Sequence, residues 1–99
     1  MKNIVLLCAA GMSTSLLVTK MREVAKKEGF DCQIDAHSVS EAQKVGEVAD
    51  VILLGPQVRF ELSRVKQLVQ CPVESIDMRA YGMMDGAKVL QQAKTAMGL

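Results

Sequence analysis

A cysteine ends the first apolar run of the chain and is followed by small and hydroxyl-bearing residues. Cys8 comes directly after the run at residues 4–7, and residues 9–15 contain Gly11 and open a helix near Thr14. Glycine adopts positive φ, and small side chains let backbone N–H groups approach a bound group closely. A helix start adds unpaired N–H donors and the positive end of the helix dipole. Such a loop favours a thiolate at Cys8 and also binds a phosphoryl group, which predicts phosphoryl transfer through a cysteine nucleophile.

The loop and the turns facing it supply the candidate site residues. Cys8 is the expected nucleophile, and the expected phosphate-binding residues are Ala9, Ala10, Gly11, Met12, Ser13, Thr14 and Ser15. The candidates for the rim of the site are Gln57, Tyr81 and Asp85. Simpler interpretations stay open: Cys8 as a small buried residue, Met12 as loop packing instead of a docking residue, and Asp85 as a helix N-cap.

Two other uses of such a loop are open alternatives. Cysteine-dependent phosphatases have the pattern Cys-x5-Arg, and Thr14 stands at the arginine position here. Without that guanidinium we expect poor hydrolysis, which suits a carrier that must pass its phosphoryl group on. A flavodoxin-like module that binds a flavin phosphate is the other alternative, but the chain has no Trp and one Tyr to sandwich a flavin ring. The two common nucleotide-binding glycine motifs, G-x-x-x-x-G-K-[ST] and G-x-G-x-x-G, are absent.

Four apolar runs alternate with longer amphipathic stretches. Two runs, at residues 4–7 and 51–54, are continuously apolar, as strands of a sheet covered on both faces are, and the run at residues 73–76 begins and ends with an apolar residue. The run at residues 31–37 alternates apolar and polar residues, which indicates a half-exposed edge strand. The pattern predicts an α/β fold: one domain over residues 1–99, with an open four-stranded parallel sheet in the order 2-1-3-4 and helices on both faces. Ligands of such sheets bind where the strand order reverses, here after strands one and three.

The helices that position the loop have recognisable boundaries. The first spans about residues 14–28 and ends at Gly29. A capping box at residues 38–41 begins a short second helix that ends near residue 46. One apolar stripe predicts a third helix over residues 58–69, and the fourth runs from about Asp85 to Met97.

Composition excludes several classes of function. With 12 basic and 11 acidic residues the net charge is +1, which argues against nucleic acid as a partner. The cysteines Cys8, Cys32 and Cys71 are odd in number and form no metal-ligand pattern, so we expect no metal, no cofactor and a reducing cytosol, with Cys32 and Cys71 as packing residues. His37 is expected to be a solvated surface residue. The first apolar run is too short for a signal peptide or a membrane span, so the chain is expected to be soluble.

Several motifs resemble one bacterial family. Residues 8–18 (CAAGMSTSLLV) look like the phosphocysteine loop of the enzyme IIB components of the sugar phosphotransferase system, in the lactose/cellobiose/chitobiose class. The resemblance continues through residues 50–57 (DVILLGPQ), 76–77, 81–82 and 85–86 and so covers essentially the whole chain. Cellobiose-type members have Ser where this chain has Ala9.

The resemblance implies a role as a phosphoryl carrier. Cys8 would accept a phosphoryl group from a phosphohistidine of the IIA component. It would pass the group to a sugar bound by the membrane component IIC, a β-linked disaccharide such as cellobiose, chitobiose or lactose. The chain would then be a cytoplasmic transferase, peripheral to the membrane through IIC.

Overall fold

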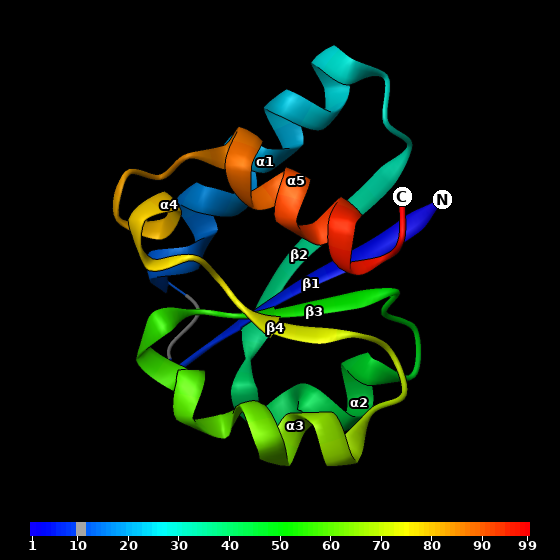
Figure 1. Ribbon diagram of the computed structural model, residues 1–99, viewed down its shortest axis with the longest axis vertical. Helices are drawn as coiled ribbons and strands as arrows, with labels where there is room; N and C mark the ends of the chain where they lie inside the picture. Colours follow the sequence, from blue (N-terminus) through cyan, green and yellow to red (C-terminus); the bar gives the residue numbers. More distant parts are fainter. Residues whose placement is uncertain (10–11) are drawn as a thin grey trace.

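The carboxyl ends of four parallel strands meet at one end of a single sheet (Figure 1). The computed structural model describes residues 1–9 and 12–99, with the backbone alone for Met12 and Ser13. The strands are β1 (Lys2–Cys8), β2 (Cys32–Ser38), β3 (Val51–Leu54) and β4 (Val73–Ser75). Their order is β2-β1-β3-β4, which confirms the order predicted from the apolar runs. β1 and β3 are therefore neighbours, and the order reverses beside Cys8.

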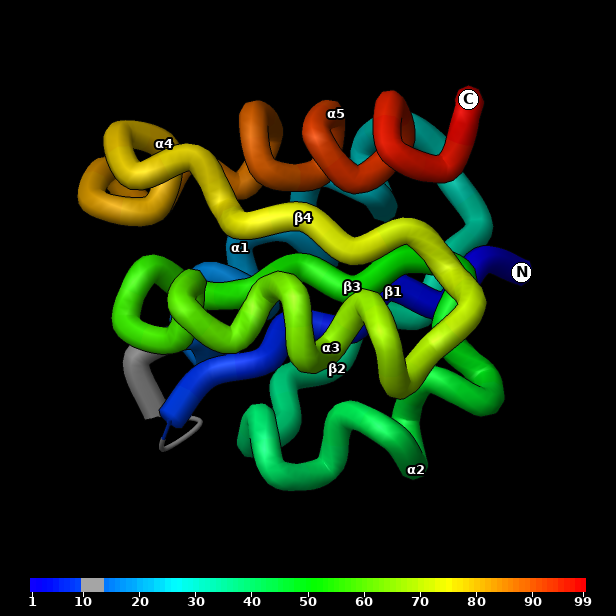
Figure 2. The backbone as a smooth tube through the Cα atoms, turned by 60° about the horizontal axis from the view of Figure 1, so that its bottom comes forward, coloured from blue at the N-terminus to red at the C-terminus, as the bar shows by residue number. Residues whose placement is uncertain are grey.

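Helices cover both faces of the sheet, as predicted. Alternate residues of β1 point to opposite faces, so that Ile4 and Leu6 pack under α1 (Met12–Glu28) and α5 (Gly86–Ala96). Val5 and Leu7 pack on the other side, toward α2 (Ala42–Gly46) and α3 (Leu62–Leu68). Figure 2 shows the two layers with the strands between them. Because Cys8 follows Leu6 by two positions, the alternation directs its side chain to the α1 face.

The first helix ends where the sequence predicts. Gly29 has φ +68°, in the left-handed region that favours glycine. Its N–H donates to the carbonyl of Lys26, and the N–H of Phe30 donates to the carbonyl of Ala25 at 2.9 Å. This pair of bonds is the Schellman arrangement, which satisfies the last carbonyls of α1.

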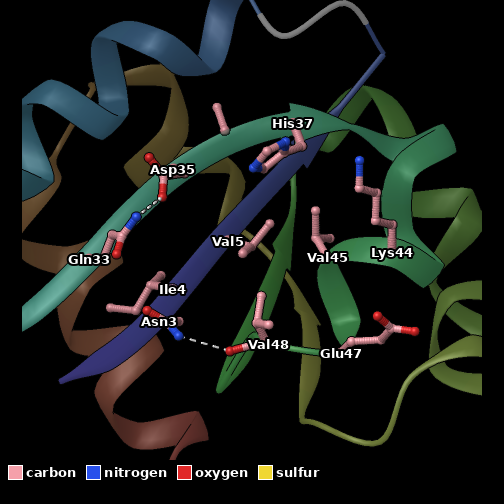
Figure 3. Close-up of a pocket in the computed structure, with 11 residues that line it drawn as sticks. Asn3, Ile4, Val5, Gln33, Asp35, His37, Lys44, Val45, Glu47 and Val48 are labelled. Atoms are coloured by element: carbon pink, nitrogen blue, oxygen red, sulfur yellow. Dashed lines mark hydrogen bonds between the residues drawn. The ribbon is translucent and has the colours of Figure 1, made fainter.

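Strand β2 is the predicted half-exposed edge strand. Ile34 is buried, Gln33 is exposed, and Asp35 and His37 are half-buried. The short helix α2 leaves part of the sheet face over β2 uncovered, and a groove of about 650 Å³ lies there. In Figure 3 polar side chains of β2 line one wall and residues of α2 and the following turn line the other.

Two connections differ from the prediction. The capping box of Ser38 and Glu41 is present, but it opens a 3₁₀ turn, η1 (Val39–Glu41), before α2. The predicted helix over residues 58–69 is wrong in its first part, because residues 56–61 form a 3₁₀ segment, η2 (Pro56–Glu61), and α3 follows it. The N–H of Val58 donates to the carbonyl of Gly55 at 3.0 Å. This tight turn lets Val58 enter the core so soon after β3.

Helix α4 (Met78–Gly82) was not predicted, because five residues carry too little apolar periodicity. The carboxylate of Asp77 accepts from the N–H of Ala80 at 2.9 Å and caps this helix. The carboxylate of Asp85 accepts from the N–H of Lys88 at 3.1 Å, which confirms its interpretation as the N-cap of α5. Within the described part of the chain, no helix has the length and apolarity to cross a membrane.

Candidate functional site

The end of β1 and the first turn of α1 meet at a buried hydrogen bond. The hydroxyl of Thr14 donates to Sγ of Cys8 at 3.1 Å. Cys8 is 1% exposed and Thr14 is fully buried. Thr14 is the third residue of α1, and α1 packs on the face to which Cys8 points, so the sequence brings the two groups together. A hydroxyl donor at this distance stabilises negative charge on the sulfur.

The burial of Cys8 taken alone fits a simple packing residue. Its hydrogen bond satisfies the buried hydroxyl of Thr14 and at the same time directs a donor at the sulfur, which a purely apolar residue at position 8 could not accept. Sequence reasoning grouped Thr14 with the phosphate-binding residues and noted that it replaces an arginine, but it missed the bond to the sulfur. The signal was present, since Cys8 ends a strand and Thr14 lies in the next helical turn.

The turn after β3 approaches Cys8 from the other side of the reversal point. The N–H of Gly55 donates to the carbonyl of Leu7 at 2.8 Å. A β-carbon added at Gly55 would lie 3.6 Å from Cβ of Cys8 and 3.2 Å from Oε1 of Gln57. The exposed Gln57 amide therefore lies beside Gly55, on the side where Cys8 lies, as a rim residue must.

The other two rim candidates lie in the helices after β4. Tyr81 is part of α4 and only 8% exposed, with its ring in the core under α1 and α5. The carboxylate of Asp85 is engaged as the cap of α5. Core packing thus accounts for the Tyr81 ring and capping for the Asp85 carboxylate, whereas Gln57 lies beside the turn that approaches Cys8; a rim role for any of the three stays a prediction.

Part of the predicted phosphate loop lies outside the described residues. This holds for Ala10 and Gly11, and for the side chains of Met12 and Ser13. Ala9 and Ser15 are exposed, and α1 begins at Met12, so its amino end follows Cys8 closely in the chain. Lys26 and Lys27 in the last turn of α1 suit the negative end of the helix dipole, and its first turn has no acidic residue to neutralise the positive end.

The other two cysteines lie elsewhere and are half-buried. Burial raises the pKa of the Cys32 thiol, and the nearby charge of Asp31 raises it further. Burial likewise raises the pKa of the Cys71 thiol. Both pack against core clusters, as expected. In residues 1–9 and 12–99, no group of three or more His, Cys, Asp and Glu side chains could hold a metal ion.

The groove of Figure 3 is separate from the Cys8–Thr14 pair. It runs along the amino half of β1, past Asn3 and Val5, on the face opposite to α1. His37 lies at its upper end, half-exposed, with Nδ1 at 3.4 Å from a carboxylate oxygen of Glu41. The expected surface histidine is therefore confirmed, and this groove is not where the cysteine chemistry would occur.

Comparison with known proteins gives a consistent result. The family model described as "PTS system, Lactose/Cellobiose specific IIB subunit" matches residues 3–92. The oligo-β-mannoside-specific EIIB component of Bacillus subtilis is 46% identical, over 98% of this chain and 97% of its own length. The galactose-specific EIIB component of Lactococcus lactis subsp. cremoris is 43% identical, over 97% of this chain and 96% of its own.

Solved structures have the same fold. The cellobiose-specific IIB component of Borrelia burgdorferi has a TM-score of 0.82 and 39% identity, over 98% of this chain and 92% of its own. The lactose-specific IIB domain of Streptococcus pneumoniae has a TM-score of 0.85 over 96% of both chains. At 19% identity this second likeness concerns the fold alone.

Proposed function

Because the chain belongs to the lactose/cellobiose-specific IIB family of the sugar phosphotransferase system, we propose that Cys8 is the residue that carries its phosphoryl group. The chain is a phosphotransferase and a sugar-specific component of this system, and IIB components work with IIA and IIC partners. The finer proposal concerns the atoms: the phosphoryl group moves from a phosphohistidine of IIA to Sγ of Cys8, and then to a sugar held by IIC.

The two steps balance with a thiolate as nucleophile and leaving group. In the first, the sulfur attacks phosphorus, an S–P bond forms, and the P–N bond breaks with its electron pair returning to the imidazole of the donor. In the second, a sugar hydroxyl attacks phosphorus and the S–P bond breaks. The thiolate is then restored, and the hydroxyl proton passes to a base on the acceptor side.

The observation that carries this proposal is the bond of 3.1 Å from the Thr14 hydroxyl to Cys8 Sγ. A buried hydroxyl that donates to sulfur favours the anionic form on which both steps depend. The start of α1 just beyond Cys8 supports a phosphate-binding role for residues 9–15. The position of the Gln57 amide beside Gly55 supports a hydrogen bond from Gln57 to a phosphoryl oxygen.

Partners and sugar follow from the same family. We place the chain on the cytoplasmic side of the membrane, where IIA delivers and IIC receives the phosphoryl group. The sugar proposed is a β-linked disaccharide such as cellobiose, chitobiose or lactose. The relatives are named for oligo-β-mannoside, galactose and cellobiose, so the choice among sugars is tested by transfer to each in membranes that contain the cognate IIC.

Replacement of Cys8 by serine tests the carrier role. With the upstream phosphate donors and IIA present, the intact mass of the wild-type chain is expected to rise by one phosphoryl group. Cys8→Ser should abolish phosphorylation of the sugar, because serine at neutral pH offers no comparable anion or leaving group.

The matched controls are Cys32→Ser and Cys71→Ser, which should keep transfer because both side chains pack away from the Cys8–Thr14 pair. Sugar phosphorylation by Cys8→Ser at the wild-type rate would contradict the proposal. Cys8-dependent turnover of a small aryl phosphate would instead favour a phosphatase.

A further inference from the structure

A guanidinium group lies at the same end of the sheet as Cys8. Arg59 is part of η2, which follows β3, the direct neighbour of β1. Gly55, just before η2, bonds to Leu7, and Val58 bonds back to Gly55. Arg59 therefore comes one residue after the turn at residues 55–58, which is hydrogen-bonded to β1, the strand that ends in Cys8. In Figures 1 and 2 residues 56–61, in green, lie at the end of the sheet where β1 ends.

The guanidinium reaches across to the end of β4. Nη1 of Arg59 lies 3.2 Å from the thioether sulfur of Met78, the first residue of α4. The N–H of Ile76 donates to the carbonyl of Leu54 at 2.8 Å and joins the ends of β4 and β3. A thioether is a weak acceptor, so this contact holds the guanidinium only loosely.

The charge of Arg59 is not balanced locally. In the part of the chain that the structure describes, no carboxylate pairs with it. Glu61 pairs with Arg64 at 2.6 Å, and the carboxylate of Asp77 caps α4. Arg59 is exposed, as are its neighbours Phe60 (78%) and Met78 (59%), so the N–H donors that do not contact Met78 are open to an incoming group. A planar cation with so few partners can turn to an arriving anion at little cost.

We propose that Arg59 leaves Met78 during transfer and donates hydrogen bonds to the oxygens of the phosphoryl group as it passes to Cys8. This inference rests on the proposed function. Thr14 occupies the position at which cysteine-dependent phosphatases have their arginine, and Arg59 supplies that positive charge from the neighbouring turn. Arg79 follows β4, one strand further from β1, and is less well placed.

The role is electrostatic and leaves the bond changes unaltered. The S–P bond forms as the P–N bond breaks, while the guanidinium stays protonated and balances the charge that spreads over the phosphoryl oxygens. The contact with the phosphoryl group is made by hydrogen bonds from an exposed side chain, so it can break again when the group leaves. A carrier needs such temporary binding, since it must release the group to the sugar.

Single-turnover transfer from phosphorylated IIA to the full chain tests this role, with the donor concentration varied. Arg59→Gln should lower the maximal rate about tenfold or more, because a charge-assisted contact in the transition state is lost. Arg59→Lys should recover part of it, since the charge returns without the planar fork. The matched control is Arg64→Gln, which removes a guanidinium already paired with Glu61 and should transfer at a rate close to wild type.

The outcomes separate this inference from the carrier proposal. An unchanged maximal rate for Arg59→Gln would overturn the inference. A higher half-saturating donor concentration alone would also overturn it, because Arg59 would then contact only the surface of IIA. If the wild-type chain formed no phosphocysteine, the proposed carrier function itself would be contradicted. Equal thermal unfolding midpoints for wild type and Arg59→Gln exclude a folding defect as the cause of slow transfer.

Discussion

One hydroxyl distinguishes Cys8 from the other cysteines of the chain. Cys32 and Cys71 are half-buried, and burial raises the pKa of each thiol, so they stay protonated and inert near neutral pH. Cys8 is more deeply buried than either, yet its sulfur accepts a hydrogen bond from Thr14. A donor aimed at the sulfur stabilises negative charge that develops there during transfer.

Replacement of Thr14 measures what this hydroxyl contributes. Thr14→Val keeps the volume of the side chain and removes the donor. We expect transfer to Cys8 to slow about ten- to a hundredfold, because a hydrogen bond to a charged group typically contributes about 1.5–3 kcal/mol. The measurement is single-turnover phosphorylation by phosphorylated IIA.

Thr14→Ser is the matched control, since it keeps the hydroxyl and should retain most of the rate. Equal rates for Thr14→Val and wild type, with equal unfolding midpoints, would mean that the bond to sulfur has no part in the chemistry.

At the scale of elements, α1 and α5 come into contact at a glycine. A β-carbon added at Gly86 would lie 2.7 Å from the carbonyl carbon of Lys20 and 2.8 Å from the backbone nitrogen of Met21. Backbone atoms in the middle of a helix cannot turn aside as the end of a side chain can. The two helices therefore approach as closely as they do only because position 86 has no side chain.

Gly86→Ala should lower the free energy of unfolding by about 1–3 kcal/mol, because overpacking forces α1 and α5 apart. Urea denaturation followed by circular dichroism measures the loss. Gly82→Ala is the control: nothing lies within 4 Å of its added β-carbon, and alanine is the better helix former. If both variants have the same urea midpoint as wild type, the close approach of α1 and α5 at Gly86 does not contribute to the free energy of unfolding.

Elements with a strong period were predictable from the sequence, and short irregular ones were not. Two continuous apolar runs and the run at residues 73–76 identified three strands, and the alternation at residues 31–37 identified the edge strand and so the order of the sheet. Gly29 marked the end of α1 correctly. The 3₁₀ segment η2 was mistaken for the start of a helix, because an apolar residue at every third or fourth position fits both geometries. Helix α4 is too short to show a period.

The part of the candidate site that was predictable from the sequence is the part whose residues are adjacent in the chain. Cys8 and its loop are contiguous, so the pattern indicated them. The contact of Arg59 with Met78 joins turns after two different strands, and no spacing in the sequence reports it. Asp85 and Tyr81 were candidates because they follow β4, but capping and core packing occupy them.

At the scale of the whole molecule, side chains bond to backbone groups on both edges of the sheet. On the β2 edge, Nε of Arg22 donates to the carbonyl of Ile34 at 2.9 Å. On the β4 edge, the amide of Gln92 donates to the carbonyl of Ser75 at 2.8 Å and accepts from the N–H of Asp77 at 3.2 Å. Gln92 thus occupies two of the backbone groups to which a neighbouring strand could bind, and such edges otherwise promote association.

Gln92→Ala should therefore make the chain associate as its concentration rises, because it opens the β4 edge. Size-exclusion chromatography with light scattering measures the mass, and circular dichroism verifies that the fold is kept. Gln91→Ala is the matched control on the same helix, since among the described residues the Gln91 side chain bonds only to the hydroxyl of Thr95, at 3.4 Å. A folded Gln92→Ala variant that has the mass of wild type at every concentration would show that the Gln92 amide does not protect the edge.

The close approach at Gly86 also acts on the reactive end of the molecule. α1 is a stiff rod, and the contact at Lys20 lies about 9 Å along its axis from Thr14, at 1.5 Å per residue. A displacement of α1 at Gly86 also moves its amino end, where Thr14 lies. The length of the hydrogen bond from Thr14 to Cys8 can change by only a few tenths of an ångström before the bond weakens. The residue at position 86 thus affects the alignment of the Thr14 hydroxyl with Cys8 Sγ, although the two sites are far apart. A shift of α5 would slow phosphoryl transfer before it unfolded the chain.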